Sequence, residues 1–183
     1  DGLLKALDTT PKVEKKVDTT NTEAYEYYLK GKYKFNKRRN LEDVETSREF
    51  FQKAIEMDDN LIIANNYLAW SYYQGGDYDE ALIIYTHSLK KAKEIGNRSG
   101  LGHTLNGLGA VCSMGDQNKA LEYYTRSLEM LKQLGDKRGM GAVFNNIGII
   151  YHYKGNYDKS LDYYIRLLKI SEEIGNKIGV STS

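Results

Sequence analysis

Three histidines and one cysteine are the residues of this 183-residue chain that could support metal or nucleophilic chemistry. His87, His103 and His152 lie in different segments, at no spacing that metal ligands use. A nucleophilic pair would need Cys112 beside a histidine, but Cys112 occupies an apolar helix-packing position, where buried thiols are generally inert. The sequence therefore predicts no catalytic residue, no metal site and no cofactor.

The glycine-rich segment GLGAVCSMG at 107–115 has the composition of a phosphate-binding loop. It neither follows an expected strand nor opens an expected helix, so the geometry that cradles a phosphate is missing. The formal net charge is +1, and the basic cluster NKRRN at 36–40 is small enough to be a solvated helix end. We therefore expect no enzymatic activity and no nucleic-acid binding.

The composition, with 40% hydrophobic and 28% charged residues, is typical of a soluble globular protein. No apolar run approaches the ~20 residues of a membrane span, so no membrane insertion is expected. A single cysteine excludes an intrachain disulfide and favours a reducing, cytoplasmic location. Because no Met begins the chain and it stops where another helix should start, we expect a fragment of a longer protein, truncated at its C-terminus.

Blocks of sequence repeat at intervals of about 40 residues. Three of them share a Gly-Asp or Gly-Asn start, an apolar row at helical spacing and a late glycine: GDYDEALIIYTHSLKKAKEIGN (76–97), GDQNKALEYYTRSLEMLKQLGD (115–136) and GNYDKSLDYYIRLLKISEEIGN (155–176). A similar apolar segment precedes each block, so each unit is expected to be two amphipathic helices. A helix pair cannot bury its apolar face alone, and stacked pairs form a solenoid.

The boundaries of these helices are marked by capping residues. Asp77, Asp116 and Asn156 are expected N-caps of the second helices. The glycines that should end those helices lie 39 and 40 residues apart, at Gly96, Gly135 and Gly175. We expect a linker at 1–20 and a repeat domain at 21–183, whose four units span 21–59, 60–98, 99–137 and 138–177.

The unit pattern resembles the tetratricopeptide repeat (TPR) family. In the last unit the matching residues are Ile147, Gly148, Tyr151, Gly155, Tyr157, Ser160, Tyr164 and Leu167. The resemblance implies an all-α fold, a right-handed α-solenoid of stacked antiparallel helix pairs, and a non-catalytic role in protein–protein interaction. In the third unit Cys112 replaces the expected tyrosine and the turn is one residue short.

The 40-residue period resembles a TPR variant with longer second helices, found in regulators of spindle orientation, kinesin light chains and bacterial signalling proteins. The opening NTEAYEYYLKGKYKFNKR at 21–38 also resembles the start of repeat regions fused to bacterial adenylate and guanylate cyclases. These resemblances imply that the chain is part of a larger signalling protein.

The candidate binding residues form a stripe beside the packing face of each first helix, facing the expected concave groove. An asparagine heads each stripe, followed by aromatic, aliphatic or histidine side chains, and the set is Asn66, Trp70, Tyr73, His103, Asn106, Asn145, Ile149 and His152. In the resembling family such positions contact ligand peptides. The alternative is that these asparagines bond to neighbouring helices or to water; Asn146 and Asn65 are interpreted as structural or solvated.

The expected partner is a protein or peptide. Because the groove lacks the Lys and Arg residues that would hold a terminal carboxylate, we expect an internal segment or an amphipathic helix as ligand. A second hypothesis is self-association, as a homo-oligomer formed through the uncapped apolar end, which would position a fused catalytic or regulatory domain.

Overall fold

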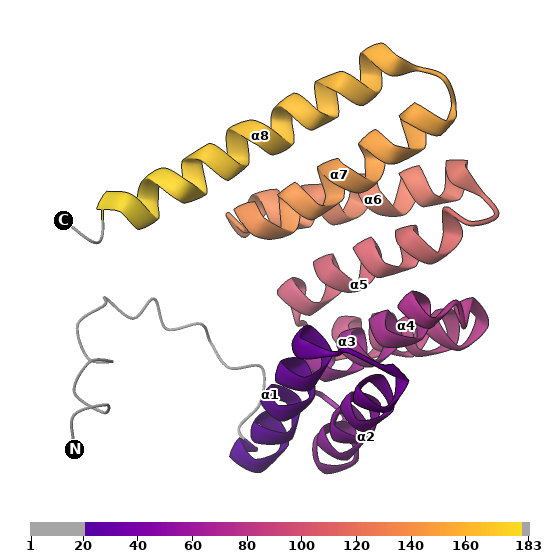
Figure 1. Cartoon of the computed structure of the whole chain (residues 1–183), viewed down its shortest axis with the longest axis vertical. Helices are drawn as coiled ribbons and strands as arrows, with labels where there is room; N and C mark the ends of the chain where they lie inside the picture. Colours follow the sequence, from indigo (N-terminus) through magenta and orange to yellow (C-terminus); the bar gives the residue numbers. More distant parts are fainter. Residues whose placement is uncertain (1–20, 181–183) are drawn as a thin grey trace.

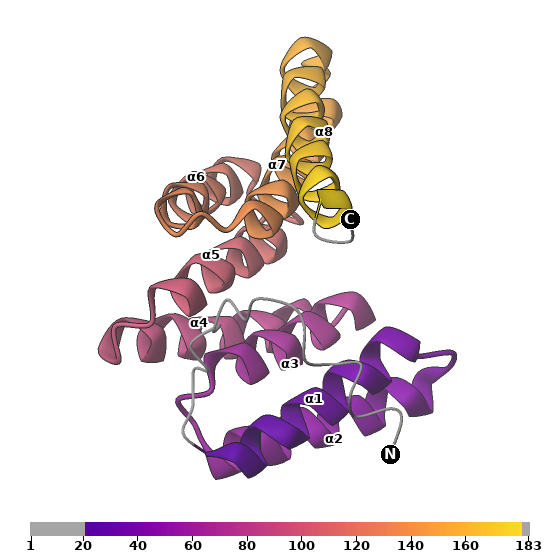
Figure 2. The same ribbon diagram turned by 90° about the vertical axis from the view of Figure 1, so that its left-hand side faces the viewer.

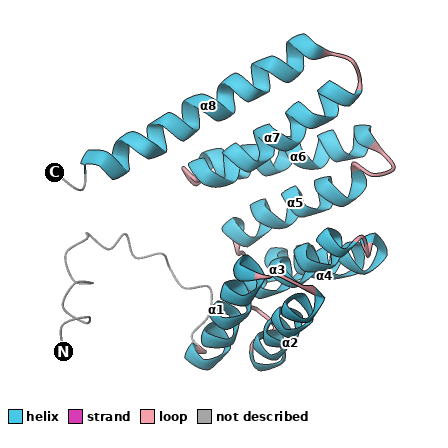
Figure 3. Cartoon of the chain, viewed as in Figure 1, coloured by secondary structure: helices cyan, strands magenta, loops and turns pink. Residues whose placement is uncertain are grey.

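The chain folds into helices throughout the part that the structure describes. The computed structural model describes residues 21–180, with side chains as far as Gly175; the expected linker at 1–20 lies outside this range. Helices and loops, but no strands, make up the described residues (Figure 3). The helices are α1 (Thr22–Lys37), α2 (Leu41–Met57), α3 (Ile62–Gly75), α4 (Tyr78–Glu94), α5 (Arg98–Cys112), α6 (Gln117–Gln133), α7 (Lys137–Tyr153) and α8 (Tyr157–Val180).

The second helices begin at the residues expected from the sequence. Asp116 accepts hydrogen bonds from the backbone N–H groups of residues 118 and 119, and Asn156 accepts one from residue 159, which confirms both caps. Asp77 stands at the N-cap position of α4 but makes no capping bond. Its carboxylate instead lies 3.5 Å from the guanidinium of Arg48.

The glycine signals for helix ends hold in two of the three units. Gly96 and Gly135 adopt left-handed φ values of 67° and 66°, as a glycine that ends a helix does. The prediction for Gly175 is wrong, because α8 runs through this residue to Val180. Within the described residues no helix follows α8 to hold a turn there, and continued helix satisfies the backbone groups instead.

The eight described helices stack as antiparallel pairs in chain order, from α1 and α2 at one end to α7 and α8 at the other (Figures 1 and 2). The backbone of each first helix also lies close to that of the first helix of the next pair, whereas the backbones of α2, α4, α6 and α8 do not approach one another in the described chain. The first helices α1, α3, α5 and α7 therefore line the inner side. This arrangement is an all-α solenoid, as expected.

The packing of this stack depends on aromatic rings that lie directly on glycine backbone. A Cβ added to Gly109 would lie 2.5 Å from the ring of Tyr124 on α6, in the same unit. A Cβ added to Gly107 would lie 2.2 Å from Tyr85, which belongs to the preceding unit and is 3% exposed. The glycines of α5 thus allow the helix to approach its own partner and its neighbour closely.

Replacing Gly107 with alanine is therefore expected to destabilise the fold. Overlap of the new methyl group with the buried Tyr85 ring should cost about 1–3 kcal/mol, partly offset by the roughly 1 kcal/mol by which alanine favours a helix over glycine. Gly175→Ala is the matched control, because it is also helical but has no atom within 4 Å of the added Cβ. Urea unfolding of the two variants measures this difference, and a Gly107→Ala variant as stable as Gly175→Ala would contradict it.

Candidate peptide-binding groove

Two cavities open on the inner side of the solenoid. The first, called the aromatic cavity, has a volume of about 420 Å³ and is lined by Trp70, Tyr73, Ala110, Ser113, Met114, Gln117, Tyr124, Asn146, Ile149, Ile150 and Tyr153. The second, called the charged cavity, measures about 460 Å³ and is lined by Tyr28, Lys32, Phe35, Asn36, Ile63, Asn66, Tyr67, Trp70, His103, Asp136, Arg138 and Gly139. Trp70 belongs to both, so the cavities are parts of one groove.

The aromatic cavity has a preformed apolar wall and no charged side chain in its lining. The rings of Trp70 and Tyr73 stack with their centroids 5.1 Å apart and an interplanar angle of 19°. Tyr153, on the opposite wall, is 77% exposed. Burial raises the pKa of Tyr73, so its phenol is a neutral hydrogen-bond donor at pH 7. Stacked rings with polar edges are suited to contact a protein ligand.

The lining of the charged cavity contains two basic side chains, Lys32 and Arg138, and one acidic side chain, Asp136. The Lys32 ammonium lies 5.8 Å and 5.7 Å from the ring centroids of Tyr28 and Tyr67. Asp136 pairs with His103, whose Nε2 lies 3.0 Å from its Oδ2, and it also accepts a bond from the backbone that starts α7. No ion pair of Lys32 or of Arg138 occurs within the described residues, so both can face a ligand.

The asparagines of the inner surface bond from each unit to the next. The Oδ1 of Asn66 accepts a hydrogen bond of 2.8 Å from the hydroxyl of Thr104 on α5. In the next unit the Oδ1 of Asn106 accepts a bond of 3.1 Å from the Nδ2 of Asn146 on α7. The alternative interpretation, bonding to neighbouring helices, therefore describes both residues. A direct contact between these asparagines and a ligand stays a prediction.

The structure brings most of the sequence-derived candidates together. Trp70, Tyr73 and Ile149 line the aromatic cavity, and Asn66 and His103 line the charged one. Asn106 lines neither cavity but accepts a hydrogen bond from Asn146, which lines the aromatic cavity. The remaining two candidates, Asn145 and His152, line neither cavity.

Asn146, which the sequence analysis interprets as structural or solvated, lies on the inner surface of the solenoid. It lines the aromatic cavity and bonds to Asn106, whereas the side chain of Asn145 has no hydrogen bond in the described part of the chain. The repeat register did not indicate Asn146: it lies 40 residues after Asn106, whereas Gly109 and Gly148, which each pack on the tyrosine of their own unit, are 39 residues apart. His152 instead packs its ring edge-on against its neighbours Tyr153 and Tyr157.

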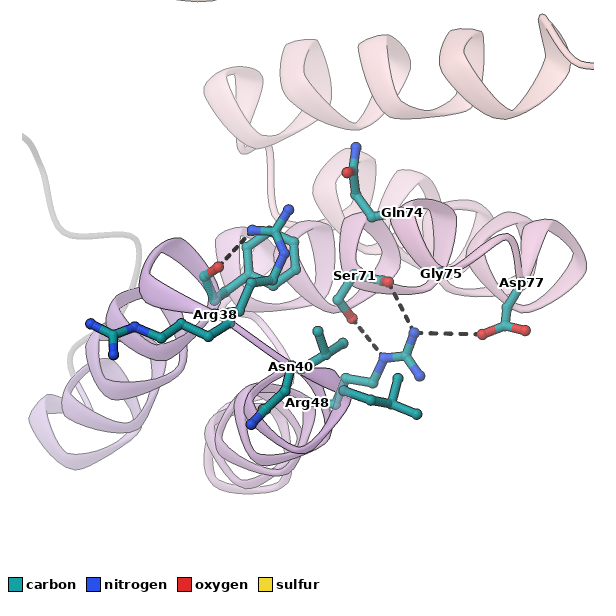
Figure 4. A pocket seen from close by; sticks show the side chains of 11 residues that line it. Arg38, Asn40, Arg48, Ser71, Gln74, Gly75 and Asp77 are labelled. Carbon is teal, nitrogen blue, oxygen red and sulfur yellow. Dashed lines mark hydrogen bonds and ion pairs between the residues drawn. The ribbon is translucent and has the colours of Figure 1, made fainter.

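A third cavity, of about 400 Å³, lies between α1, α2 and α3 (Figure 4). The guanidinium of Arg48 donates to the hydroxyl and the carbonyl of Ser71, at 3.1 Å and 2.9 Å, and faces Asp77. Arg38 donates to the carbonyl of Phe35 at 2.6 Å. The bonds from Arg48 on α2 to Ser71 on α3 join the first unit to the second at this cavity.

The surroundings of the described side chains favour neither nucleophilic catalysis nor metal binding. Burial raises the pKa of the Cys112 thiol, which lowers its nucleophilicity at neutral pH. Over residues 21–175 no group of three or more His, Cys, Asp or Glu side chains is placed to hold a metal ion. None of the described helices combines the length and the apolar character that crossing a bilayer requires.

Comparisons with known proteins identify the family. Two models described as "Tetratricopeptide repeat" match residues 59–133 and 143–178, together more than half of the chain. The chain belongs to the tetratricopeptide repeat family. TPR units are protein-interaction scaffolds, typically without catalytic activity, and proteins that contain them generally bind protein partners. A search of curated protein sequences found no significant match.

Solved structures of low sequence identity share the TPR fold. BtubC (BKLC) from P. vanneervenii matches with a TM-score of 0.65 and 18% identity, over 83% of this chain and 64% of that protein. Aspartyl phosphate phosphatase F from Bacillus subtilis matches with a TM-score of 0.68 and 17% identity, over 83% of this chain and 41% of that protein. A thermophilic TPR protein from Thermus thermophilus matches with a TM-score of 0.53 and 16% identity, over 81% of this chain and 75% of that protein. The chain thus spans less than two thirds of the first two proteins.

The hydrogen bond between Asn106 and Asn146 is expected to couple the third and fourth units. Asn106→Ala and Asn146→Ala should each lower the free energy of unfolding by about 0.5–1.5 kcal/mol, and the double variant should lose less than the sum. Asn145→Ala, the adjacent control, should change stability by no more than about 0.5 kcal/mol. Urea unfolding of the four variants measures the coupling, and strictly additive losses would show that the bond does not form.

Proposed function

We propose that this chain is a non-catalytic interaction module that binds a peptide or a helix of a partner protein in its inner groove. The observation that carries the proposal is the aromatic cavity, where Trp70 and Tyr73 form a stacked, accessible wall on a rigid frame. Large aromatic side chains in a preformed pocket are the usual anchors of protein interfaces, because they bury much area at little entropic cost.

The charges of the groove favour an internal segment as the ligand. A terminal carboxylate is usually held by several Arg or Lys side chains with convergent donors. Here the two cations, Lys32 and Arg138, line the charged cavity, while the aromatic cavity has none. A helix or extended strand that places apolar side chains against Trp70 suits this distribution better than a chain end.

The proposal that this chain is part of a larger signalling protein rests on sequence resemblance. The opening at 21–38 is similar to repeat regions of cyclase-type bacterial signalling proteins, which supports a place in a larger signalling protein. The single cysteine favours a cytoplasmic location.

The second hypothesis, self-association through the uncapped end, has a surface to support it. α8 exposes the apolar side chains of Leu161 and Leu168, at 59% and 58%. Sedimentation over a wide concentration range tests this hypothesis, because a persistent monomer would contradict self-association.

Binding in the groove should be visible through Trp70, the single tryptophan of the chain. Peptides selected from a random display library should shift its emission, and Tyr153→Ala should weaken them about tenfold or more through lost apolar contact. Because Tyr153 is mostly exposed, the Tyr153→Ala variant should have the same thermal unfolding midpoint as the unchanged chain.

Ile83→Ala on α4 is the matched control, since Ile83 is a 62% exposed apolar side chain outside both cavities. Selected peptides that bind the Tyr153→Ala variant at full strength, with unchanged Trp70 emission, would contradict groove binding.

A further inference from the structure

The charged cavity is shared by all four units of the solenoid. Its lining comes from α1, α3, α5 and the start of α7, so Lys32 and Arg138 face the same space although they belong to the first and the last unit. The backbones of α1 and α7 do not approach one another in the described chain, and Figure 1 shows the two helices in the first and the last pair of the stack. A ligand side chain in this cavity can therefore contact both units at once.

Two aromatic rings hold the ammonium group of Lys32 at the wall of the cavity. It lies 5.8 Å from the ring centroid of Tyr28 and 5.7 Å from that of Tyr67, within the range of a cation–π interaction. Tyr28 is 1% exposed and packs against the rings of Phe51 and Tyr67, which fixes this wall. Because the rings orient the cation without neutralising it, its charge is available to an anion.

The acid of the cavity already bonds to the protein through both of its oxygens. The Oδ2 of Asp136 lies 3.0 Å from the Nε2 of His103, and its Oδ1 accepts a hydrogen bond of 2.9 Å from the backbone N–H of Gly139. Neither Lys32 nor Arg138 forms an ion pair within the described residues. The two cations of the cavity are therefore the groups that a ligand can pair with.

The charges of the lining favour a carboxylate over a phosphate. Lys32 and Arg138 each carry a positive charge and Asp136 a negative one, which leaves one positive charge in excess when His103 is neutral. A single carboxylate balances that excess. A phosphorylated side chain, with a charge of about −1.5 to −2 at pH 7, would leave unpaired negative charge beside Asp136.

The neighbouring aromatic cavity assigns the two kinds of ligand side chain to different places. Trp70 lines both cavities, and the aromatic one has no charged side chain that could pair with an acid. A carboxylate buried without a partner is costly, so an acidic side chain is directed to the charged cavity and an apolar one to the aromatic cavity. The two side chains of one ligand then lie on either side of the Trp70 indole.

We propose that the charged cavity binds the carboxylate of an internal aspartate or glutamate of the partner segment, which pairs with Lys32 and Arg138 and so bridges the first and the fourth unit. This inference rests on the proposed binding of a peptide or helix in the groove. It adds the chemistry of the partner, which is an acidic residue close in space to an apolar residue that packs against Trp70.

Selection from two random display libraries tests the proposal on the full chain. In both, each peptide is fused at its C-terminus to a carrier protein, so no terminal carboxylate is free, and the second library lacks Asp and Glu. Peptides from the first library that shift the emission of Trp70 should contain an acidic residue. Its replacement by Asn or Gln should weaken binding about tenfold or more, through the loss of charge-assisted hydrogen bonds. The tightest peptides of the second library should bind about tenfold or more weakly than those of the first.

Variants of the chain identify the cations that hold the acid. Lys32→Gln and Arg138→Gln should each weaken an acidic peptide about tenfold and leave its Asn or Gln variant unchanged. Lys30→Gln is the matched control: it removes the same charge from α1, but Lys30 lines neither cavity and lies over the ring of Tyr27, 4.9 Å from its centroid. Added salt should weaken the acidic peptide more than its uncharged variant.

Three outcomes would overturn the proposal and leave groove binding intact. The first is a set of equally tight peptides from the library without acids, which Tyr153→Ala still weakens but Lys32→Gln and Arg138→Gln do not. The second is an acidic peptide that Lys30→Gln weakens as much as Lys32→Gln does, because the attraction would then be unspecific. The third is tighter binding when phosphoserine replaces the acidic residue. If neither library yields a peptide that shifts Trp70 emission, the proposed function fails and this inference fails with it.

Discussion

The close approach of tyrosine rings to glycine backbone is the contact on which this solenoid depends. Tyr124 lies on Gly109 and Tyr164 on Gly148 within their units, and Tyr85 lies on Gly107 between units. A helix pair of this length has little core of its own, so contacts between units, such as that of Tyr85 with Gly107, add to its stability. Because a ring against a glycine leaves no room for a side chain, it fixes both the distance between two helices and their rotation.

That rotation decides which side chains reach the inner surface. On α7, the rotation that places Gly148 on Tyr164 also turns Asn146 toward Asn106 and the aromatic cavity. The stacked Trp70 and Tyr73 are presented by α3, beside a serine and a methionine of the next unit. The groove is therefore a consequence of the repeat packing, and because it is preformed, a partner can bind without the groove first becoming ordered.

The sequence predicted the fold through periodicity alone, because a 40-residue repeat of two apolar faces has few solutions other than stacked helix pairs. It was less reliable at single positions. Residues 145 and 146 point in directions that differ by about 100° around a helix, so a register error of one residue changes the surface that a side chain faces. The turn between the two helices of the third unit is one residue short: the backbone N–H of Asp116 donates to the carbonyl four residues earlier, at Cys112, whereas the corresponding N–H groups of Asp77 and Asn156 donate to carbonyls five residues earlier. The short turn changes the spacing of equivalent residues between units. The charged cavity joins four helices, so no local pattern could place Arg138 beside His103.

The central claim is that a partner binds on the inner surface of the first helices. Chemical-shift mapping of the chain with a peptide selected for binding tests it most directly. The account predicts shifts at the Trp70 indole N–H and the Ile149 methyl groups, with Ile83 on α4 unchanged. Shifts confined to the outer surface of α4 and α6, with Trp70 unaffected, would contradict it.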